Sequence, residues 1–412
     1  MKFVGRFAIS LLVISLAGVT AHASDWPQFL GPSRDGTSPG TELAATFPPG
    51  GPKILWQKDV GQGFSGPAVA DGKLILFHRL NDKETVECLD AKTGNRLWLS
   101  DYPTHYQDDF GFDEGPRATP TITGGKIYTL GAEGMISCWD FASGRNLWQV
   151  DTKTQFTAAK GFFGMACSPL VEGDAVILNI GGGQGSGIIA LDKSTGKLLW
   201  KATDEEAGYS SPVAATFGGK RYVLVFNREG LVALDPINGT VTFNFHWRSR
   251  SRESVNAATP LIIGDDIFVS ASYGAGAALL KFNPAGPVKI WSGDNILSNH
   301  YATSVYHAGF LYGFEGRQET GPKLRCVDVK DGSVKWSQDD FGAGTLMVAG
   351  DRLLILTEKG ELVLAPASPD GFHPISRAQI LPFEVRAYPA LADGLYFARS
   401  KDKLVCVDLH KQ

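Results

Sequence analysis

The stretch Asp90-Ala-Lys-Thr-Gly-Asn-Arg-Leu-Trp98 decides the fold, because the same phrase returns along the chain. Clear copies lie at Asp140–Trp148, Asp192–Trp200 and Asp328–Trp336, and weaker copies lie at 235–243 and 282–291. The closing aromatic residue recurs every 43 to 52 positions, which is the period of one four-stranded β-propeller blade. A unit of this size cannot bury its own faces, so we expect the copies to pack against one another.

Each repeat divides into four short strands, which we call A to D. In the first copy they are expected at 65–69, 73–77, 85–90 and 95–99. Proline begins strand A in most copies, and proline is confined to sheet edges, so strand A should be innermost, facing the central channel. The aromatic residue on strand D should then lie at the outer edge and fill the gap between neighbouring blades. The tryptophans at this position are Trp56, Trp98, Trp148, Trp200, Trp291 and Trp336.

The last blade needs a strand from the other part of the chain. The region after residue 388 supplies only three strands, and the segment Lys53–Lys58 offers the fourth. Pairing them closes the ring and leaves no open sheet edge. We therefore predict an all-β, eight-bladed β-propeller closed by an N-terminal strand. Seven blades is the alternative, if the weak copy at 344–375 merges with the last one.

The N-terminal residues have the pattern of an export signal. Lys2 and Arg6 precede an apolar run over 7–17, and Ala21-His-Ala23 is typical of a signal peptidase site. We expect a signal peptide over 1–23, an extended segment over 24–52 and the propeller over 53–412. The apolar run is too short to span a bilayer and no comparable run follows, so we expect no transmembrane segment. The first cysteine is Cys88, which argues against a lipid anchor at the cleavage site. The expected location is periplasmic or secreted.

The net charge limits the classes of binding partner, and the positions of the cysteines indicate whether they form disulfides. A formal net charge of −4 favours neither nucleic acid nor an anionic membrane as a partner. Four of the five cysteines stand two residues before the repeated Asp, in four different blades. Equivalent points on packed sheets lie about 10 Å apart, beyond the Cα separation of about 7 Å that a disulfide allows. We expect Cys88, Cys138, Cys326 and Cys406 to be buried thiols, and Cys167 to be unpaired.

The Asp-x-x-Thr-Gly-x-x-x-Trp phrase resembles the tryptophan-docking repeat of the pyrroloquinoline quinone (PQQ) propeller superfamily. That superfamily holds the quinoprotein alcohol dehydrogenases and the non-enzymatic BamB-type outer-membrane assembly factors, which are both eight-bladed. The segment Asp25–Thr37 also resembles the start of PQQ-like propellers of unknown activity. The resemblance spans residues 54–409 and implies the architecture, but a propeller fold does not by itself imply an activity.

Any binding site should lie at the end of the ring that carries the longer loops. In an antiparallel blade, the A–B and C–D turns share one end, and the B–C and D–A loops share the other. At this end, the residues that precede each strand A surround the mouth of the central channel, and most of them are polar. Such a mouth suits a polar ligand or a peptide. The alternative is that the polar residues are solvated and bind no ligand. The candidate ligand-binding residues are Arg117, Glu253, Asn256, His300, Tyr301, Arg317, Glu319 and Arg386.

The acidic loop over 105–117 allows two interpretations. Its four carboxylates could supply oxygen ligands for Ca²⁺, although the spacing is not that of an EF-hand. A solvated acidic loop is the interpretation that we favour. No Ser-His-Asp group and no His/Cys metal spacing is present, so we assign no catalytic and no metal-binding residue.

Two functions remain open. The resemblance to quinoprotein dehydrogenases implies PQQ held between a Trp and a pair of adjacent cysteines, with Ca²⁺ bound by Glu, Asn and Asp. This chain has no adjacent cysteines, and Trp247 is the one Trp in a mouth loop. Glu253 and Asn256 could imitate metal ligands, but no Asp is assignable as the base.

We therefore expect that the chain binds no cofactor. We expect it to be a monomeric, exported, non-catalytic binding or scaffolding propeller that is BamB-like. Its ligand would be a periplasmic or cell-envelope protein, a polymer or a small polar molecule. A PQQ- and Ca²⁺-dependent alcohol or sugar dehydrogenase is the alternative.

Overall fold

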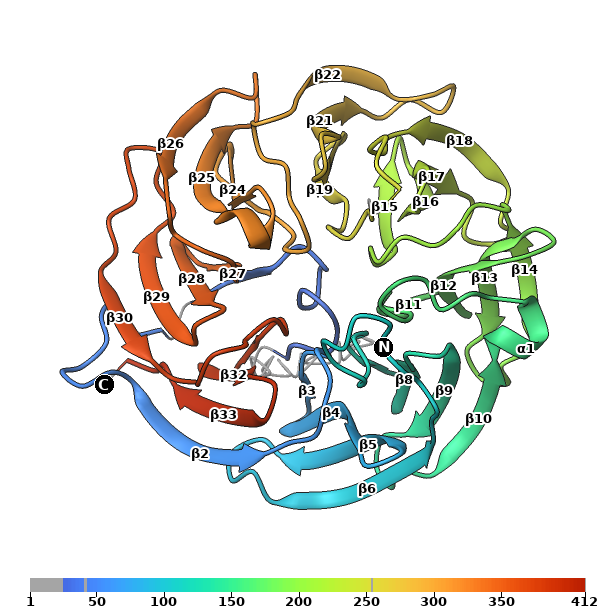
Figure 1. The fold of residues 1–412 in the computed structure, drawn as a ribbon, viewed down its shortest axis with the longest axis horizontal. Helices are drawn as coiled ribbons and strands as arrows, with labels where there is room; N and C mark the ends of the chain where they lie inside the picture. The colour runs from blue at the N-terminus through green and yellow to red at the C-terminus, as the bar shows by residue number, and fades with distance from the viewer. Residues whose placement is uncertain (1–24, 41–42, 253–254, 412) are drawn as a thin grey trace, which may run out of the picture.

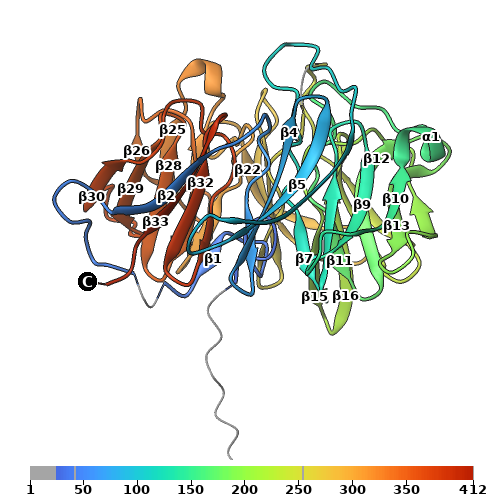
Figure 2. The same ribbon diagram turned by 90° about the horizontal axis from the view of Figure 1, so that it is seen from below.

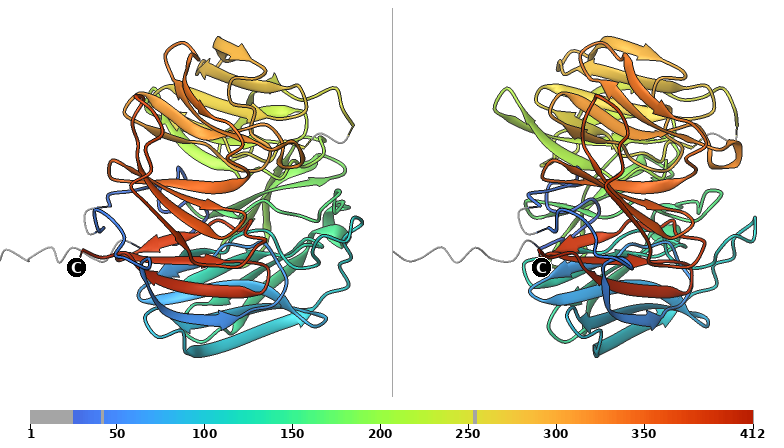
Figure 3. Two further views of the ribbon diagram at one scale, coloured as in Figure 1. Left: turned by 60° about the vertical axis from the view of Figure 1, so that its left-hand side comes forward. Right: turned by 90° about the vertical axis from the view of Figure 1, so that its left-hand side faces the viewer.

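Eight antiparallel sheets stand around a central channel in the computed structural model, which describes residues 25–40, 43–252 and 255–411 (Figure 1). Each sheet is one blade, and the predicted eight-bladed, all-β propeller is confirmed. Figure 3 shows the blades side by side in oblique and edge-on views. Two short helices are present in the described ranges: α1 (Thr152–Phe156) follows blade two, and the 3-10 helix η1 (Gln318–Thr320) lies in blade six.

The first four blades follow one another along the chain. Blade one holds β3 (Ala68–Ala70), β4 (Lys73–Leu80), β5 (Lys83–Asp90) and β6 (Arg96–Pro103). Blade two holds β7 (Thr121–Thr123), β8 (Lys126–Leu130), β9 (Met135–Asp140) and β10 (Asn146–Asp151). Blade three holds β11 (Leu170–Glu172), β12 (Ala175–Gly182), β13 (Ser186–Asp192) and β14 (Leu198–Ala202). Blade four holds β15 (Val213–Phe217), β16 (Lys220–Phe226), β17 (Gly230–Leu234) and β18 (Val241–His246).

The other four blades complete the ring. Blade five holds β19 (Leu261–Ile263), β20 (Asp266–Ala271), β21 (Gly276–Lys281) and β22 (Val288–Gly293). Blade six holds β23 (Val305–His307), β24 (Phe310–Glu315), β25 (Lys323–Asp328) and β26 (Val334–Gln338). Blade seven holds β27 (Gly344–Ala349), β28 (Arg352–Thr357), β29 (Glu361–Pro366) and β30 (Ser376–Gln379). Blade eight holds β31 (Ala390–Ala392), β32 (Leu395–Arg399), β33 (Lys403–Asp408) and β2 (Lys53–Asp59).

The ring closes as the sequence predicts. Strand β2 pairs antiparallel with β33, with Trp56 opposite Cys406, so blade eight is built from both parts of the chain. An ion pair joins β2 to the next blade, because Lys58 Nζ lies 3.2 Å from Glu87 Oε1 on β5. Closure therefore combines sheet pairing within blade eight with a charged contact to blade one.

The innermost strands are held together by a belt of hydroxyl groups that the sequence analysis did not predict. Strand A is the innermost strand of its blade (Figure 1). Each hydroxyl of the belt accepts a hydrogen bond from a backbone N–H of the preceding blade. The bonds run from Gly66 N to Thr119 (3.2 Å), Thr119 N to Ser168 (2.9 Å), Ser168 N to Ser211 (2.9 Å), Ser211 N to Thr259 (3.3 Å) and Thr259 N to Thr303 (2.9 Å). The belt satisfies backbone groups that are buried at the crowded channel wall.

The docking tryptophans lie between neighbouring blades, as predicted. Trp148 is buried, its indole N–H donates to the Lys193 carbonyl of blade three (3.2 Å), and its ring covers Gly196 in the C–D turn. A glycine is required there, since its φ is +72° and a Cβ would overlap the indole. The same indole-to-carbonyl bond to the next blade is made by Trp56, Trp98, Trp200, Trp291 and Trp336, at 2.8–3.3 Å.

Apolar side chains fill the space between the sheets. Between blades three and four, Ile177, Ile188 and Val223 are fully buried, and each such side chain contributes about 1.5–3 kcal/mol by leaving water. All five cysteines are buried and free, as predicted.

The segment before β2 closes the channel at the end with the short turns. Trp26 forms a bridge with Val69 of β3, and β1 (Thr37–Ser38) pairs parallel with β27 as a fifth strand of that sheet (Figure 2). Arg34 reaches into the ring, where its guanidinium donates to the carbonyls of Ser168 (3.1 Å), Pro169 (2.8 Å) and Pro212 (2.8 Å). Burial lowers the pKa of this guanidinium to about 10, so it remains charged at neutral pH. The expected signal peptide over 1–23 lies outside the described residues.

Candidate functional site

The longer loops gather at one end of the ring, which we call the loop face. They are the D–A connections over 104–120, 157–169, 203–212, 247–260, 294–304 and 380–389. Figure 2 shows this end on the same side as α1, opposite β1. Because the other end is closed by the N-terminal segment, the open mouth of the channel lies at the loop face.

Arg117 and Arg386 are brought together at this mouth by one aromatic ring. The Arg117 guanidinium lies 5.7 Å from the centre of the Phe64 ring, and the Arg386 guanidinium lies 5.4 Å from it. Each cation also has a carboxylate partner: Arg117 Nη2 lies 3.0 Å from Asp108 Oδ2, and Arg386 Nε lies 2.7 Å from Glu358 Oε1. The two predicted arginines are therefore held in fixed positions with their charge balanced.

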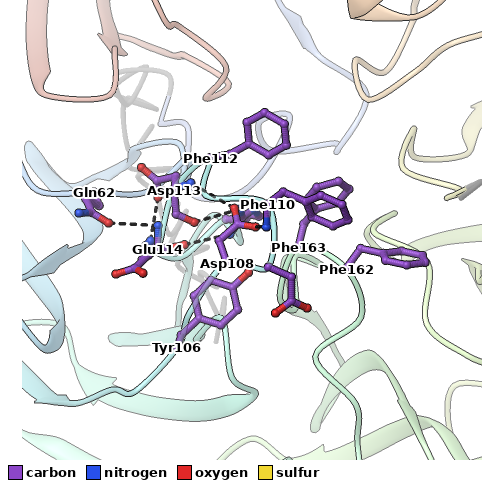
Figure 4. A network of polar contacts seen from close by, with 12 residues as sticks. Gln62, Tyr106, Asp108, Phe110, Phe112, Asp113, Glu114, Phe162 and Phe163 are labelled. Atoms are coloured by element: carbon purple, nitrogen blue, oxygen red, sulfur yellow. Dashed lines mark hydrogen bonds and ion pairs between the residues drawn. The ribbon is translucent and has the colours of Figure 1, made fainter.

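The acidic loop is more ordered than the solvated loop that we expected. The Asp108 side chain is fully buried, and it accepts hydrogen bonds from the backbone N–H groups of Phe110 (3.0 Å) and Asp113 (3.1 Å). Asp113 is also buried, and its Oδ1 accepts from Gly115 N (2.7 Å). These carboxylates shape the loop (Figure 4). Over the ranges that the structure describes, no three His, Cys, Asp or Glu side chains are grouped as metal ligands.

His300 and Arg317 form a second group, across Tyr273. His300 Nε2 lies 3.2 Å from the Tyr273 hydroxyl, and the Arg317 guanidinium lies 4.8 Å from the centre of the same ring. Gln318 donates its backbone N–H toward His300 Nδ1 (3.4 Å) and its amide to Glu358 Oε1 (2.5 Å), which links this group to Arg386. Burial lowers the pKa of His300, and the negative charge of Glu319 opposes this shift.

The other predicted site residues lie at different depths. Tyr301 packs against His300, and burial raises the pKa of its hydroxyl. Glu319 is exposed in η1. Asn256 is 1% exposed, and its amide donates to the backbone carbonyls of Asn227 (2.8 Å) and Trp247 (3.0 Å). Glu253 lies outside the described residues.

The sequence analysis missed an aromatic cluster on the loop face. Phe110 and Phe112 come from the loop after β6, and Phe162 and Phe163 come from the loop after α1 (Figure 4). The ring centres of Phe110 and Phe163 are 5.1 Å apart, and Phe163 packs against Tyr209 at 5.9 Å. Phe110 is 54% exposed and Phe112 is 45% exposed. We call these four phenylalanines the aromatic cluster. The available signal was the pair of motifs Phe-Gly-Phe and Phe-Phe in two consecutive D–A loops.

PQQ with Ca²⁺ does not fit the residues at this mouth. The amide nitrogen of Asn256 donates to two carbonyls, and its Oδ1 has no hydrogen-bond partner among the described residues. No three His, Cys, Asp or Glu side chains in the described ranges are grouped to complete a metal site with that oxygen. The Trp247 indole donates to the Gly276 carbonyl (3.1 Å) and stacks on Phe245, which places the ring against β21 rather than over the channel. The cysteines are dispersed and buried. No chemistry at the mouth is therefore assigned to the quinone.

Comparison with known proteins shows the family of this propeller. The family model described as "Outer membrane protein assembly factor BamB" matches residues 82–338, which is more than half of the chain. The chain belongs to the BamB-like family of PQQ-type propellers. No described helix of this family member is long and apolar enough to cross a membrane.

Similar proteins include outer membrane protein assembly factors and alcohol dehydrogenases. The BamB of Shewanella oneidensis is 23% identical over 399 residues, covering 90% of this chain and 92% of the relative. The crystal structure of BamB from Moraxella catarrhalis superimposes with a TM-score of 0.62 at 16% identity, covering 86% of this chain and 96% of that one. The quinohemoprotein alcohol dehydrogenase of Comamonas testosteroni gives a TM-score of 0.69 at 14% identity, covering 94% and 81%. At these identities the structural likeness establishes the fold alone.

Proposed function

We propose that this chain is an exported, non-catalytic propeller that uses its loop face to bind another protein of the cell envelope. The observation that carries the proposal is the aromatic cluster, in which Phe110 and Phe112 remain about half exposed on ordered loops. Exposed aromatic rings grouped on a rigid support are typical of protein interfaces. The relatives named as outer membrane protein assembly factors support a binding role of this kind.

The surrounding charges favour a protein partner over a small ionic ligand. Arg117 and Arg386 each have a carboxylate within 3.0 Å, so neither offers a free charge to an anion. Their guanidinium groups instead support the rings of Phe64 and Phe112. We infer a periplasmic or secreted location, reached through the signal peptide over 1–23, and a monomer in the absence of the partner.

In-cell photo-cross-linking tests the proposal on the full chain. A photoreactive amino acid at Phe112 should capture one discrete envelope protein. In a chain that carries the probe at Phe112, the variant Phe110→Ser should reduce this capture without lowering thermal stability, since the ring is half exposed. The control is Ile237→Ser, because Ile237 is 86% exposed in the turn between β17 and β18 at the opposite end. Equal capture by both variants would contradict the proposal.

A second experiment examines the enzymatic alternative. The purified mature protein is titrated with PQQ in the presence of Ca²⁺, and dye reduction is followed with alcohols and sugars. We expect no saturable binding of the quinone. Saturable binding together with turnover would overturn the non-catalytic assignment.

A further inference from the structure

A cavity of about 340 Å³ lies between blades three and four at the loop face. This volume is within the range of pockets that hold small ligands or single side chains. The loops after α1, after β14 and between β16 and β17 form its walls, and the end of β12 forms its floor. The lining residues on which the argument depends are Lys160, Phe162, Asn179, Glu206, Tyr209 and Arg228.

The amide of Asn179 on β12 has no hydrogen-bond partner among the described residues. Neither Oδ1 nor Nδ2 is bonded, although the residue is only 2% exposed. Side chains alternate along a strand, and Ile177, two residues earlier, packs toward blade four. Asn179 therefore faces the same gap, in which the cavity lies. An unbonded amide at this depth costs stability, so the fold alone gives no reason to keep it.

The repeat provides an internal comparison for this position. Asn179 pairs with Ile188, four residues before the repeated Asp192. The residues at the same register in blades one, two, four, five, six and seven are Phe77, Leu130, Phe226, Val269, Phe314 and Leu356, and all are buried. In blade eight the position holds Arg399, whose guanidinium donates to three backbone carbonyls. Asn179 is thus polar where most blades are apolar, and it lacks the bonds that Arg399 makes.

The rim of the cavity is electrically balanced. Lys160 Nζ lies 2.7 Å from Asp109 Oδ1, and Arg228 is paired with Glu206 while its guanidinium lies 5.3 Å from the centre of the Phe162 ring. With both cations paired, the rim selects for an uncharged group. The one amide on the floor offers a donor and an acceptor side by side, which is the complement of another carboxamide.

We propose that this cavity binds the carboxamide of a Gln or Asn side chain from the partner polypeptide. An adjacent aromatic or apolar residue of the partner packs on Phe162 and Phe163. A side-chain carboxamide, at the end of its own stem, reaches the floor more readily than a backbone amide does. We commit to a peptide because the proposed partner of the loop face is a protein. The inference rests on the proposed function, because it names the part of the partner that enters the loop face.

Blocked dipeptides test the inference on the purified full chain. Acetyl-Phe-Gln-N-methylamide, in which the side chain carries the sole primary carboxamide, should bind saturably by calorimetry or NMR. It should bind at least about tenfold more tightly than acetyl-Phe-Glu-N-methylamide or acetyl-Phe-Leu-N-methylamide. These two controls keep the size of the side chain but introduce a charge or remove the hydrogen bonds. No saturable binding of the Gln peptide at about 10 mM would overturn the inference. Binding of N-acetylglucosamine in its place would also overturn it.

Two variants separate a binding role of Asn179 from a structural role. Asn179→Leu should abolish binding of the Gln peptide and at the same time raise thermal stability, because it removes an unbonded polar group. Ala159 is exposed and lines the cavity. The variant Ala159→Trp should therefore fill the opening of the cavity and block binding of the Gln peptide with little effect on stability. A fall in stability in Asn179→Leu, or undiminished binding in Ala159→Trp, would overturn the inference. If peptide binding fails while cross-linking at Phe112 persists, the proposed function stands and this inference falls.

Discussion

Replacing Gly196 with alanine tests the contact that joins the blades. Gly196 lies under the indole of Trp148, with a φ of +72°. An added Cβ would lie 2.8 Å from Cε3 and 2.9 Å from Cδ2 of that ring, closer than real Cβ contacts come. The matched control is Gly173→Ala in the same blade, because Gly173 has a φ of +58° and no atom within 4 Å of the added Cβ.

The losses of stability in the two variants should differ only by the steric overlap of the added Cβ with the Trp148 indole. A non-glycine residue in the left-handed region costs about 1–2 kcal/mol, and this cost applies to both. Overpacking of a filled site adds about 1–3 kcal/mol, and this applies to Gly196 only. We therefore expect losses of about 2–5 kcal/mol for Gly196→Ala and about 1–2 kcal/mol for Gly173→Ala.

A double-mutant cycle isolates the indole as the cause. Trp148→Ala should itself cost about 3–5 kcal/mol, and in that background Gly196→Ala should cost no more than Gly173→Ala does. The assay is equilibrium urea unfolding followed by circular dichroism, with unchanged slopes required before midpoints are compared. Equal losses at the two glycines in the wild-type background, or no coupling in the cycle, would refute the docking explanation.

Three further predictions concern buried polar groups. Arg34→Met should lower the free energy of unfolding by about 2–4 kcal/mol, because it removes the donor shared by three buried carbonyls. A loss no larger than that of an ordinary surface variant would contradict this structural role of Arg34. Burial and neighbouring cations lower the pKa of His78 to about 3. Between this pKa and the unfolded value of about 6.5, the folded state binds fewer protons than the unfolded state. The free energy of unfolding should therefore fall as the pH drops from about 6.5 toward 3. The variant His78→Asn should show a shallower pH dependence of the urea midpoint over that window. Glu87→Gln should lower the free energy of unfolding by about 1–3 kcal/mol, since it removes the buried carboxylate that pairs with Lys58 of the closing strand. The control Asp101→Asn removes a more exposed ion pair with Lys83 and should lower the free energy of unfolding by less than about 1 kcal/mol.

The architecture was predictable because its determinants are local and repeated. The Asp, the turn glycine and the docking tryptophan lie within nine residues, and six copies mark the blades. The closing strand followed by counting, since an incomplete last sheet requires a partner. By contrast, Arg34 occurs once and contacts carbonyls more than 130 positions away, so no periodicity pointed to it. The hydroxyl belt had a signal that was overlooked, because Thr119 and Ser168 each stand directly before the proline of strand A.

The position of the channel mouth was predictable from the sequence, but the contacts of its side chains were not. Topology placed Arg117 and Arg386 at the loop face, and the structure shows that they share the Phe64 ring. Spacing along the chain does not reveal which polar groups are already bonded, so the bonded amide nitrogen of Asn256 was indistinguishable from a free one. The aromatic cluster was missed for the opposite reason, since apolar residues in a sequence are first assigned to a core.

A repeat fold separates what the architecture requires from what it tolerates. Each blade places a side chain in nearly the same surroundings, so the other blades serve as controls for any one position. Six blades hold a buried apolar residue at this position, and blade three holds Asn179 without bonds. This exception lowers stability, and the ring itself gains nothing from it. Arg399 shows that a polar exception can be structural when it finds carbonyl partners, since its Nε and Nη2 donate to three of them. The presence or absence of such partners, more than polarity itself, therefore distinguishes a binding residue from a structural one in this propeller.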